Sequence, residues 1–363
     1  MINNIQVLRA VAALLVVFDH WAALYGGSLQ RVGACGAVGV DIFFVISGFV
    51  MIHATSGRTV SPVRFAVSRM IRIVPLYWTF TVLLVLGATI APAVFRSTTT
   101  DIAPLLKSLF FIPYEPYAPD VSQRGNVSPV LFTGWTLNYE MFFYAIFSLS
   151  LFLRQVVWQR LAVLAVLGAL VVAGLVFRPA GMLTKFYTAS LFLEFVYGIL
   201  LGISAERWLW LTPDRWVASA FVVLGLALLL TITPFFPASG RGYVLGPFAL
   251  MTVMGAVALE RHGVVVRSRL WLLLGAASYA MYLVHVLSNV IVFKAFALFP
   301  SERPEDIALC GVATLVVAAV TGVAIHLWYE RPLGRWLHAR LPESAGGEPR
   351  RTPLRATASM PTE

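Results

Sequence analysis

Charged residues are scarce in this chain. Lysine, arginine, aspartate and glutamate make up 12% of the 363 residues, whereas a soluble domain is nearer a quarter charged. Hydrophobic residues make up 59%, and the mean hydropathy is +0.82. A chain with so few charges cannot cover a water-exposed fold. We therefore expect an all-α polytopic membrane protein whose helices form one bundle.

Other absences narrow the class further. The chain shows no Walker-type phosphate loop and no internal repeat, and we expect no metal site. Cysteine occurs only as Cys35 and Cys310. A disulfide between them on the outer side is conceivable, but we expect two unrelated, unpaired small residues. The first apolar run is too long for the core of a signal peptide and lacks a small-residue cleavage site, so we expect it to remain as a span.

Positive charge is in excess, with a formal net charge of +10. The basic residues separate apolar runs instead of forming one patch, which argues against a nucleic-acid partner. If the N-terminus is cytoplasmic, the inner segments carry about twice as many lysines and arginines as the outer ones. The positive-inside rule then predicts that both termini are cytoplasmic.

Ten apolar runs are long enough to cross a bilayer, which takes about 20 helical residues. We predict spans at approximately 5–24, 36–55, 73–95, 132–153, 160–177, 187–205, 216–234, 243–260, 270–293 and 307–329.

Two segments outside these spans need an interpretation. The outer connection at about 96–131 contains LLKSLFFIP, which is too short to span. It either lies at the interface or re-enters as a lid, or it is an ordinary surface loop with a hydrophobic anchor. The end of the chain is polar and rich in proline and glycine. We predict a membrane domain over 1–335 and a cytoplasmic, disordered tail over 336–363, with no fused soluble domain.

Ionisable residues inside the spans are costly and usually have a partner or a function. Their depths follow from a rise of about 1.5 Å per residue. Two layers result. The outer half holds His20, Asp41, Glu140, Glu194 and His285, and the inner side holds Arg9, Arg69, Arg72, Glu330 and Arg331.

These layers suggest roles, each with a plainer alternative. Arg69 and Arg72 form an R-x-x-R pair that can bind phosphate with guanidinium forks, or can serve only as a positive-inside anchor. His20 and Asp41 match in depth, so the carboxylate can fix the tautomer of a catalytic imidazole, or the two can form an ion pair that orients their helices. Asp19 points about 100° away from His20 and is not expected to make this contact.

Six blocks, in order along the chain, resemble one family. They are IQVLRAVAALLVVFDH (5–20), GAVGVDIFFVISGFVM (36–51), RMIRIVPLYW (69–78), GWTLNYEMFFY (134–144), SYAMYLVH (278–285) and YERP (329–332). Together with ten spans, they resemble the membrane acyltransferase-3 family over nearly the whole chain, to about residue 335. The first two blocks are most similar to exopolysaccharide O-acetyltransferases of the succinoglycan type.

This resemblance implies an enzyme of the bacterial cytoplasmic membrane that moves an acetyl or other acyl group to a hydroxyl. The donor is acetyl-CoA or another acyl-coenzyme A. The acceptor is an exopolysaccharide, another surface glycan or its lipid-linked oligosaccharide precursor, and membrane lipids and polysaccharide-assembly proteins are further expected partners. The implied site residues are Arg9, Arg69 and Arg72 for the donor, His20, Asp41 and Glu140 for catalysis, and Tyr282, His285 and Trp135 for the acceptor.

Several alternatives stay open at this stage. His20 can act as a general base or be acylated itself. Glu140 can orient His20 or pair with an arginine, and Glu194 has no assigned role. Many relatives carry an additional esterase-like domain, and we expect none in this sequence. The acceptor can also be a macrolide-type metabolite or a lipid, and intramembrane charges also fit a glycan or lipid transporter.

Overall fold

The structure is a computed structural model that describes residues 2–57, 60–93, 95, 98–114, 129–207, 214–236, 240–298 and 303–341. Regular structure within these ranges is helical. Most of it is α-helical: α1 (Asn3–Tyr25), α2 (Gly27–Gly33), α3 (Val38–Thr55), α4 (Pro62–Ile90), α5 (Ile102–Leu109), α6 (Gly134–Ser150), α7 (Val156–Phe177), α8 (Met182–Tyr187), α9 (Phe192–Arg207), α10 (Arg215–Ile232), α11 (Arg241–Arg261), α12 (Arg269–Ala276), α13 (Ser278–Ala297), α14 (Pro304–Ile325) and α15 (Arg331–Ala339). Two 3-10 turns, η1 (Ala34–Ala37) and η4 (Thr233–Phe235), and one π-helical turn, η5 (His326–Glu330), complete the set.

The described helices include nine stretches that are long and apolar enough to cross a membrane. These are Asn3–Tyr25, Gly27–Thr55, Pro62–Ile90, Val156–Phe177, Met182–Glu206, Arg215–Phe235, Arg241–Arg261, Ser278–Ala297 and Pro304–Ala339. The predicted span at 132–153 is not among these nine and corresponds to α6, which has 17 residues and packs among α3, α4, α7 and α9. At about 1.5 Å per residue, it is at the short end of the length that crosses a bilayer. The prediction of an all-α, multi-pass membrane protein is confirmed.

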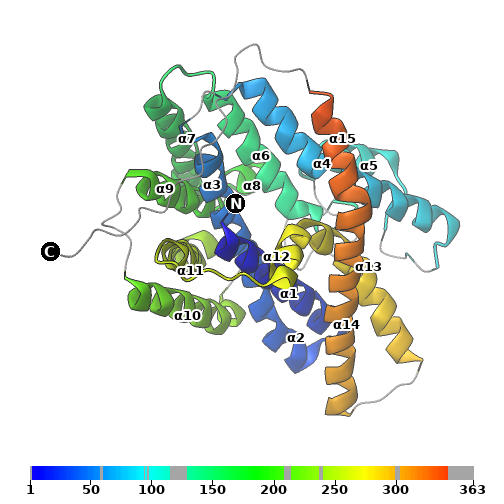
Figure 1. Cartoon of the computed structure of the whole chain (residues 1–363). Helices are drawn as coiled ribbons and strands as arrows, with labels where there is room; N and C mark the ends of the chain where they lie inside the picture. Colours follow the sequence, from blue (N-terminus) through cyan, green and yellow to red (C-terminus); the bar gives the residue numbers. More distant parts are fainter. Residues whose placement is uncertain are drawn as a thin grey trace.

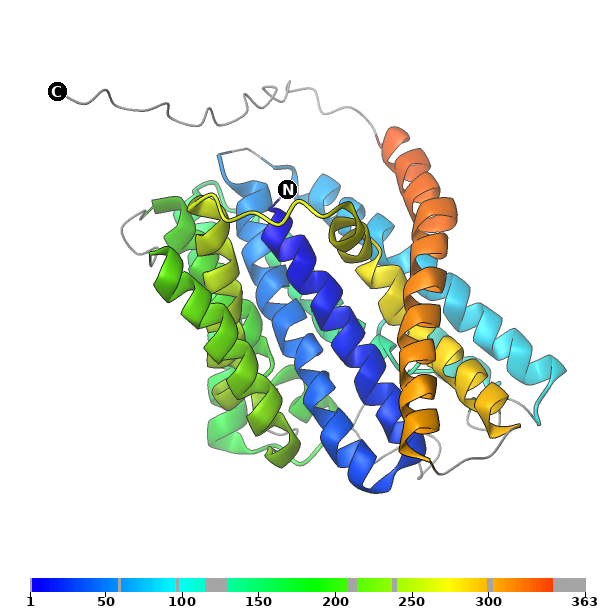
Figure 2. The same cartoon turned by 60° about the horizontal axis from the view of Figure 1, so that its bottom comes forward.

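Helix α1 lies in the interior of the bundle. It packs against α3, α11, α12, α13 and α14, with α10 and α11 on one side and α13 and α14 on the other (Figure 1). The beginning of α1 and the whole of α15 lie at the same end of the molecule (Figure 2). Residues near the beginning of α1 and residues near its end therefore lie toward opposite ends of the molecule.

The beginning of α1 is fixed by a carboxylate from another helix. Glu260, near the end of α11, accepts hydrogen bonds from the backbone N–H groups of Asn3 and Asn4 at 2.9 and 2.7 Å. These N–H groups have no partner within α1, and a negative charge is favoured there by the helix dipole. The Asn4 side chain also donates to Val264 O and accepts from Val266 N. The register of α1 against α11 is thereby set.

Glycines bring three central helices into close contact. A Cβ atom on Gly39 of α3 would overlap the Ala12 carbonyl of α1. Gly48 of α3 and Gly198 of α9 face each other in the same way, each against the backbone of the other helix. Small residues allow helices in a membrane to approach closely, and this fixes their relative rotation.

Helix α4 begins earlier than the predicted span at 73–95. Ser61 is its N-cap, with its hydroxyl accepting from Arg64 N at 3.5 Å, and Pro62 follows at the first helical position. The charges of Arg69 and Arg72 kept this turn out of an apolar window, although it is part of the same helix. Both arginines are consequently held on a rigid element.

The outer connection after α4 contains the short helix α5. Trp78 of α4 donates from Nε1 to Leu109 O at 2.8 Å, and Ser108 Oγ lies 3.0 Å from the Tyr114 hydroxyl. Ile102 and Phe110 remain largely exposed. The hydrophobic segment of this connection is thus a helix docked on α4, and residues 115–128 of the connection lie outside the described residues.

The last described helix, α15, continues to Ala339, four residues past the predicted domain boundary at 335. Most of the predicted tail, residues 342–363, lies outside the described residues.

The two cysteines are both free, as predicted. Cys310 of α14 is buried in a small apolar cluster with Trp21 and Ala22 of α1.

Candidate active site

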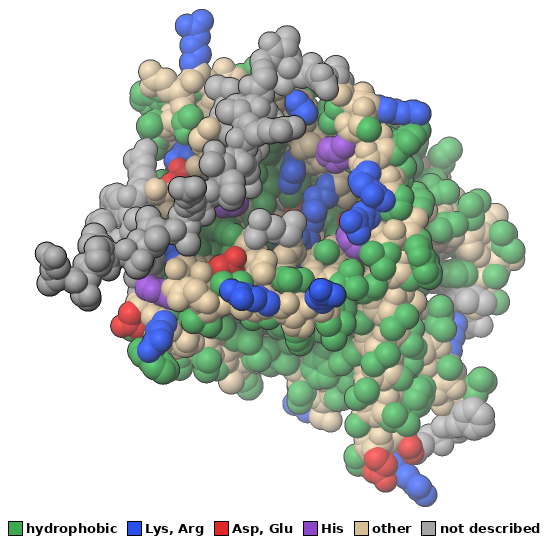
Figure 3. Space-filling model, in the orientation of Figure 1, with side chains coloured by type: hydrophobic (Ala, Val, Ile, Leu, Met, Phe, Trp, Pro, Cys, Tyr) green, Lys and Arg blue, Asp and Glu red, His purple; other side chains and the backbone are tan. Residues whose placement is uncertain are grey.

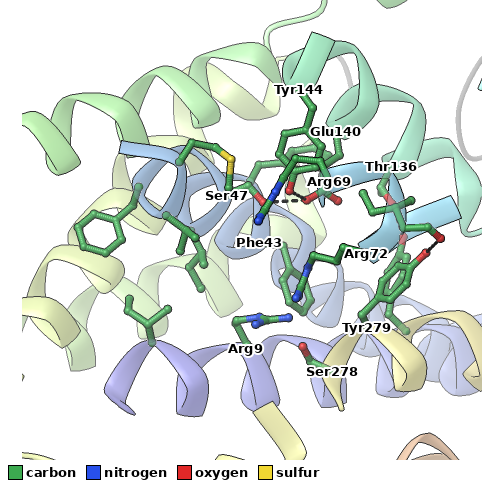
Figure 4. A pocket seen from close by; sticks show the side chains of 18 of the residues that line it. Arg9, Phe43, Ser47, Arg69, Arg72, Thr136, Glu140, Tyr144, Ser278 and Tyr279 are labelled. Carbon is green, nitrogen blue, oxygen red and sulfur yellow. Dashed lines mark hydrogen bonds between the residues drawn. The ribbon is translucent and has the colours of Figure 1, made fainter. Parts of the chain in front are cut away.

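Three arginines line one cavity. Arg9 comes from α1, and Arg69 and Arg72 come from α4, and their side chains point into a cavity of about 310 Å³ (Figure 4). The end of the molecule that carries the beginning of α1 is hollowed near its middle, and lysine and arginine side chains gather around and inside this hollow (Figure 3). The three arginines predicted to hold the donor are therefore brought together.

These arginines have few protein partners. Arg9 donates from Nη1 to Gln6 Oε1 at 3.3 Å, and Arg69 donates from Nε to the neighbouring Ser68 Oγ at 3.4 Å. The hydrogen bonds and ion pairs found among the described residues do not include one from Arg72. A cavity with several guanidinium groups and spare N–H donors suits a polyanion, because guanidinium groups bind phosphate through paired hydrogen bonds.

Glu140 lies in this arginine cavity and not in the outer layer. Its Oε1 accepts from Ser47 Oγ at 3.1 Å and from the Tyr144 hydroxyl at 2.5 Å, and Figure 4 shows it facing the side chain of Arg69. Of the two alternatives for Glu140, this position favours a place beside an arginine over the orientation of His20. The depth estimate assumed straight, full-length spans, whereas α6 is short and the cavity reaches its middle from the arginine side.

His20 and His285 form a pair at the crossing of α1 and α13, with ring centroids 4.8 Å apart. His20 Nδ1 is 2.9 Å from Val16 O, and His285 Nδ1 is 2.7 Å from Tyr282 O. A carbonyl oxygen only accepts, so each Nδ1 carries the proton. In the neutral rings, both Nε2 atoms are consequently free to accept a proton or a hydrogen bond.

The carboxylate beside His20 is Asp19, whose Oδ2 is 3.7 Å from His20 Nδ1. The sequence excluded Asp19 because neighbouring residues diverge by about 100° around a helix. Flexible side chains at the partly open end of α1 reach across that angle. The expected contact between His20 and Asp41 is replaced by this one.

Asp41 instead forms a buried ion pair with Arg241. Arg241 donates from Nη2 to Asp41 Oδ2 at 2.5 Å and from Nε to Oδ1 at 3.2 Å, and also binds Ala37 O. The Asp41 side chain is 0% exposed, and Glu194 lies next to the pair. The sequence placed Arg241 in an outer loop, but it is the first residue of α11. Basic residues at span ends are common, so the sequence held no specific signal for this pairing.

Tyr282 separates the arginine cavity from the histidine pair. Its ring lines the cavity and lies 5.8 Å from the His285 ring. Its hydroxyl is 2.7 Å from Thr136 Oγ1 and donates to Thr133 O at 3.1 Å. The Tyr282 hydroxyl is therefore already bound to Thr133 and Thr136. In this arrangement it is not available for the expected role in acceptor binding.

Two residues take places that the sequence did not anticipate. Trp135, predicted to bind the acceptor, packs edge-on against Tyr139 at 6.1 Å and is not among the residues that line the arginine cavity. His326, which the sequence did not single out, lies 2.7 Å from Glu330 through Nδ1, within the π-helical turn η5. The i,i+4 spacing of His326 and Glu330 was the available signal.

Helices α1 and α13 each carry residues of both the arginine cavity and the histidine pair. Arg9 and His20 are 11 residues apart on α1, which is three turns on one face and roughly 16 Å. Tyr282 and His285 are one turn apart on α13. A long ligand with an anionic end among the arginines would thus extend along α1 toward the histidine pair.

A family model described as an acyltransferase domain matches residues 2–325. The chain belongs to the acyltransferase-3 family. It is accordingly an acyltransferase, which acts on an acyl donor and an acceptor and transfers groups other than aminoacyl groups.

The names of similar proteins refer to exopolysaccharide production and to acyl transfer. The exopolysaccharide production protein ExoZ of Rhizobium meliloti is 39% identical over 84% of this chain and 92% of its own length. The putative membrane-bound transacylase BcsY of Komagataeibacter xylinus is 28% identical over 80% of this chain and 75% of its own. The acyltransferase MdmB of Streptomyces mycarofaciens is 26% identical over 94% of each. No solved structure matches this chain.

Proposed function

We propose that this membrane acyltransferase moves an acetyl group from cytoplasmic acetyl-coenzyme A to a hydroxyl of an exopolysaccharide, another surface glycan or its lipid-linked precursor. The observation that carries the proposal is the arginine cavity and the histidine pair at two depths of the same central helix. Coenzyme A has its phosphates at one end and its thioester at the other, so it matches this separation. The name of the relative from Rhizobium meliloti supports a polysaccharide acceptor.

The phosphates of the donor would bind Arg9, Arg69 and Arg72, which lie in one cavity with spare guanidinium donors. Glu140 would hold Ser47 and Tyr144 in place around the cavity, since its carboxylate binds both hydroxyl groups. The pantetheine arm would pass Tyr282 and bring the thioester to His20.

His20 is the general base in this proposal. Its Nδ1–H is held by Val16 O, which leaves Nε2 to take the proton from the acceptor hydroxyl. The hydroxyl oxygen attacks the thioester carbonyl, the carbon–sulfur bond breaks, and the thiolate takes the proton back from the imidazolium. The products are the ester and the free thiol, so atoms and charge balance. A route in which Nε2 is acylated first uses the same residues.

The test is the O-acetyl content of surface and secreted glycans in a deletion strain of the source organism. Complementation with the wild-type gene should restore the acetyl esters, and His20→Ala should not, because a general base contributes about 10²- to 10⁴-fold to the rate. His338→Ala is the control, since this histidine is exposed on α15 and bonds only to Gly334 O among the described residues. Equal acetylation in all strains would refute the glycan assignment and favour a metabolite acceptor.

A further inference from the structure

Four polar side chains share one face of α13. Ser278, Tyr282, His285 and Asn289 follow one another at spacings of four, three and four residues, the repeat of a single helical face. Ser278 and Tyr282 line the arginine cavity. His285 and Asn289 continue the same face beyond it, on the side of the histidine pair.

Asn289 is held against α1 one helical turn from His20. Its side chain is 2% exposed, and its Nδ2 donates to Val17 O of α1 at 3.1 Å. Val17 and His20 are one turn apart on the same helix, and His20 contacts His285, one turn from Asn289 on α13. The three side chains therefore lie within one helical turn of one another where α1 and α13 cross.

Two buried atoms at this point lack a partner. Neither His285 Nε2 nor Asn289 Oδ1 has a hydrogen-bond partner within the described part of the chain. Both atoms are acceptors: the His285 proton is on Nδ1, bound to Tyr282 O, and the Asn289 amide group has its N–H directed to Val17 O. Buried polar atoms are normally satisfied, and an unsatisfied one is costly, so a ligand with its own donors is the simplest partner.

We propose that His285 Nε2 and Asn289 Oδ1 together accept the single O–H of a second hydroxyl of the acceptor, as one shared three-centre hydrogen bond, next to the hydroxyl that His20 deprotonates. The acceptor class is then a polyol with neighbouring hydroxyls, such as a pyranose ring, and not an alcohol with an isolated hydroxyl. A single-hydroxyl acceptor leaves both buried atoms unpaired in the complex, and sites built to bind a hydroxyl discriminate strongly against analogues that lack it. This inference rests on the proposed function, in which His20 is the base.

The test compares two acceptors that differ in one hydroxyl. The full-length protein in lipid nanodiscs is given radiolabelled acetyl-coenzyme A with either cyclohexanol or trans-cyclohexane-1,2-diol, and kcat/KM per hydroxyl is measured. The wild-type enzyme should prefer the diol by roughly tenfold, as expected for one shared hydrogen bond. His285→Asn, which keeps a donor near Tyr282 O but loses Nε2, and Asn289→Leu should bring the ratio near one.

Misfolding or a general loss of rate lowers kcat/KM for both acceptors alike. The ratio of kcat/KM between the two acceptors therefore reports only the recognition of the second hydroxyl. Ser288→Ala is the matched control. Ser288 is buried beside both residues, but its hydroxyl bonds only within α13 among the described residues, to Val284 O and His285 O. It should retain the preference for the diol.

Three results would overturn the inference. They are a wild-type enzyme without preference, a preference that both variants keep, and a wild-type enzyme that acetylates the glycan of the source strain but neither these alcohols nor methyl β-glucopyranoside. If the wild-type enzyme transfers acetyl from acetyl-coenzyme A to no acceptor, the proposed function itself fails, and this inference fails with it.

Discussion

The arginine cavity carries more positive than negative charge. Arg9, Arg69 and Arg72 line it, and Glu140 is the one carboxylate among its lining residues. Excess charge at membrane depth is unfavourable unless a partner offsets it. A polyanionic donor is such a partner, and its binding would use the arginines directly.

Replacing Arg69 and Arg72 together by alanine should raise the KM for acetyl-coenzyme A by roughly 10²- to 10⁴-fold, since the two losses together amount to about 3–6 kcal/mol. Each loss removes a hydrogen bond from a charged donor, which contributes about 1.5–3 kcal/mol. Initial rates against donor concentration measure the effect. Arg64→Ala, an exposed arginine of the same helix, is the control and should leave KM within about twofold. An unchanged KM in the double variant would reduce the pair to a topological role.

At the scale of single residues, the sequence motifs predicted which side chains lie in the polar sites better than they predicted which side chains contact one another. Arg9, Arg69 and Arg72 were expected to act together, and they line one cavity. His20 was expected beside Asp41, but it contacts His285 and lies near Asp19. Spacing along one helix fixes a face, whereas the neighbour across an interface depends on how another helix is rotated.

At the scale of elements, helix α3 contacts several other helices of the bundle. Its glycines contact α1 and α9, and its Asp41 binds Arg241 of α11. The ion pair is buried at the beginning of both helices, and only 15% of the Arg241 side chain is exposed. Such a pair specifies which two helix ends meet.

Asp41→Ala should destabilise the protein by about 3–5 kcal/mol, because it leaves a buried guanidinium without its carboxylate. Adding Arg241→Met should recover a large part of this loss, since the uncompensated charge is then removed. Unfolding in detergent, measured for both single variants and the double variant, gives the coupling energy.

The Arg160–Glu206 pair, with 11% and 22% of its side chains exposed, is the comparison and should show weaker coupling because solvent screens it. Additive effects at Asp41 and Arg241 would contradict a specific pairing.

At the scale of the whole molecule, the position of the arginine cavity matters for topology. The beginning of α1 and helix α15 lie at one end (Figure 2), and the hollow with its basic side chains opens on the face that bears the beginning of α1 (Figure 3). The positive-inside bias of the sequence favours a cytoplasmic position for this end. Acyl-coenzyme A is a cytoplasmic metabolite, so the donor would meet the cavity from that side.

A fluorescent protein fused after Glu363 should therefore fluoresce in cells, and alkaline phosphatase fused after Leu298, at the end of α13, should be active. Green fluorescence requires folding in the cytoplasm, and alkaline phosphatase requires the outer side. The reverse pattern would place the arginine cavity outside, where it would not meet the donor.

The sequence by itself determined the class of the protein and most of its span order. A bilayer satisfies backbone groups only within helices or closed barrels, and continuous apolar runs of about 20 residues predict helices, because barrel strands are short and alternate in hydrophobicity. The motif blocks also determined the family, and the spacing of Arg9 and His20 put them on one face of α1.

Only the tertiary structure decided which polar groups meet. Depth can be counted along one span, but helix tilt, rotation and length are set by packing, as at Gly39 against Ala12 and Gly48 against Gly198. That packing placed Glu140 with the arginines. For the same reason, an asparagine outside every motif block came to lie beside the histidine pair.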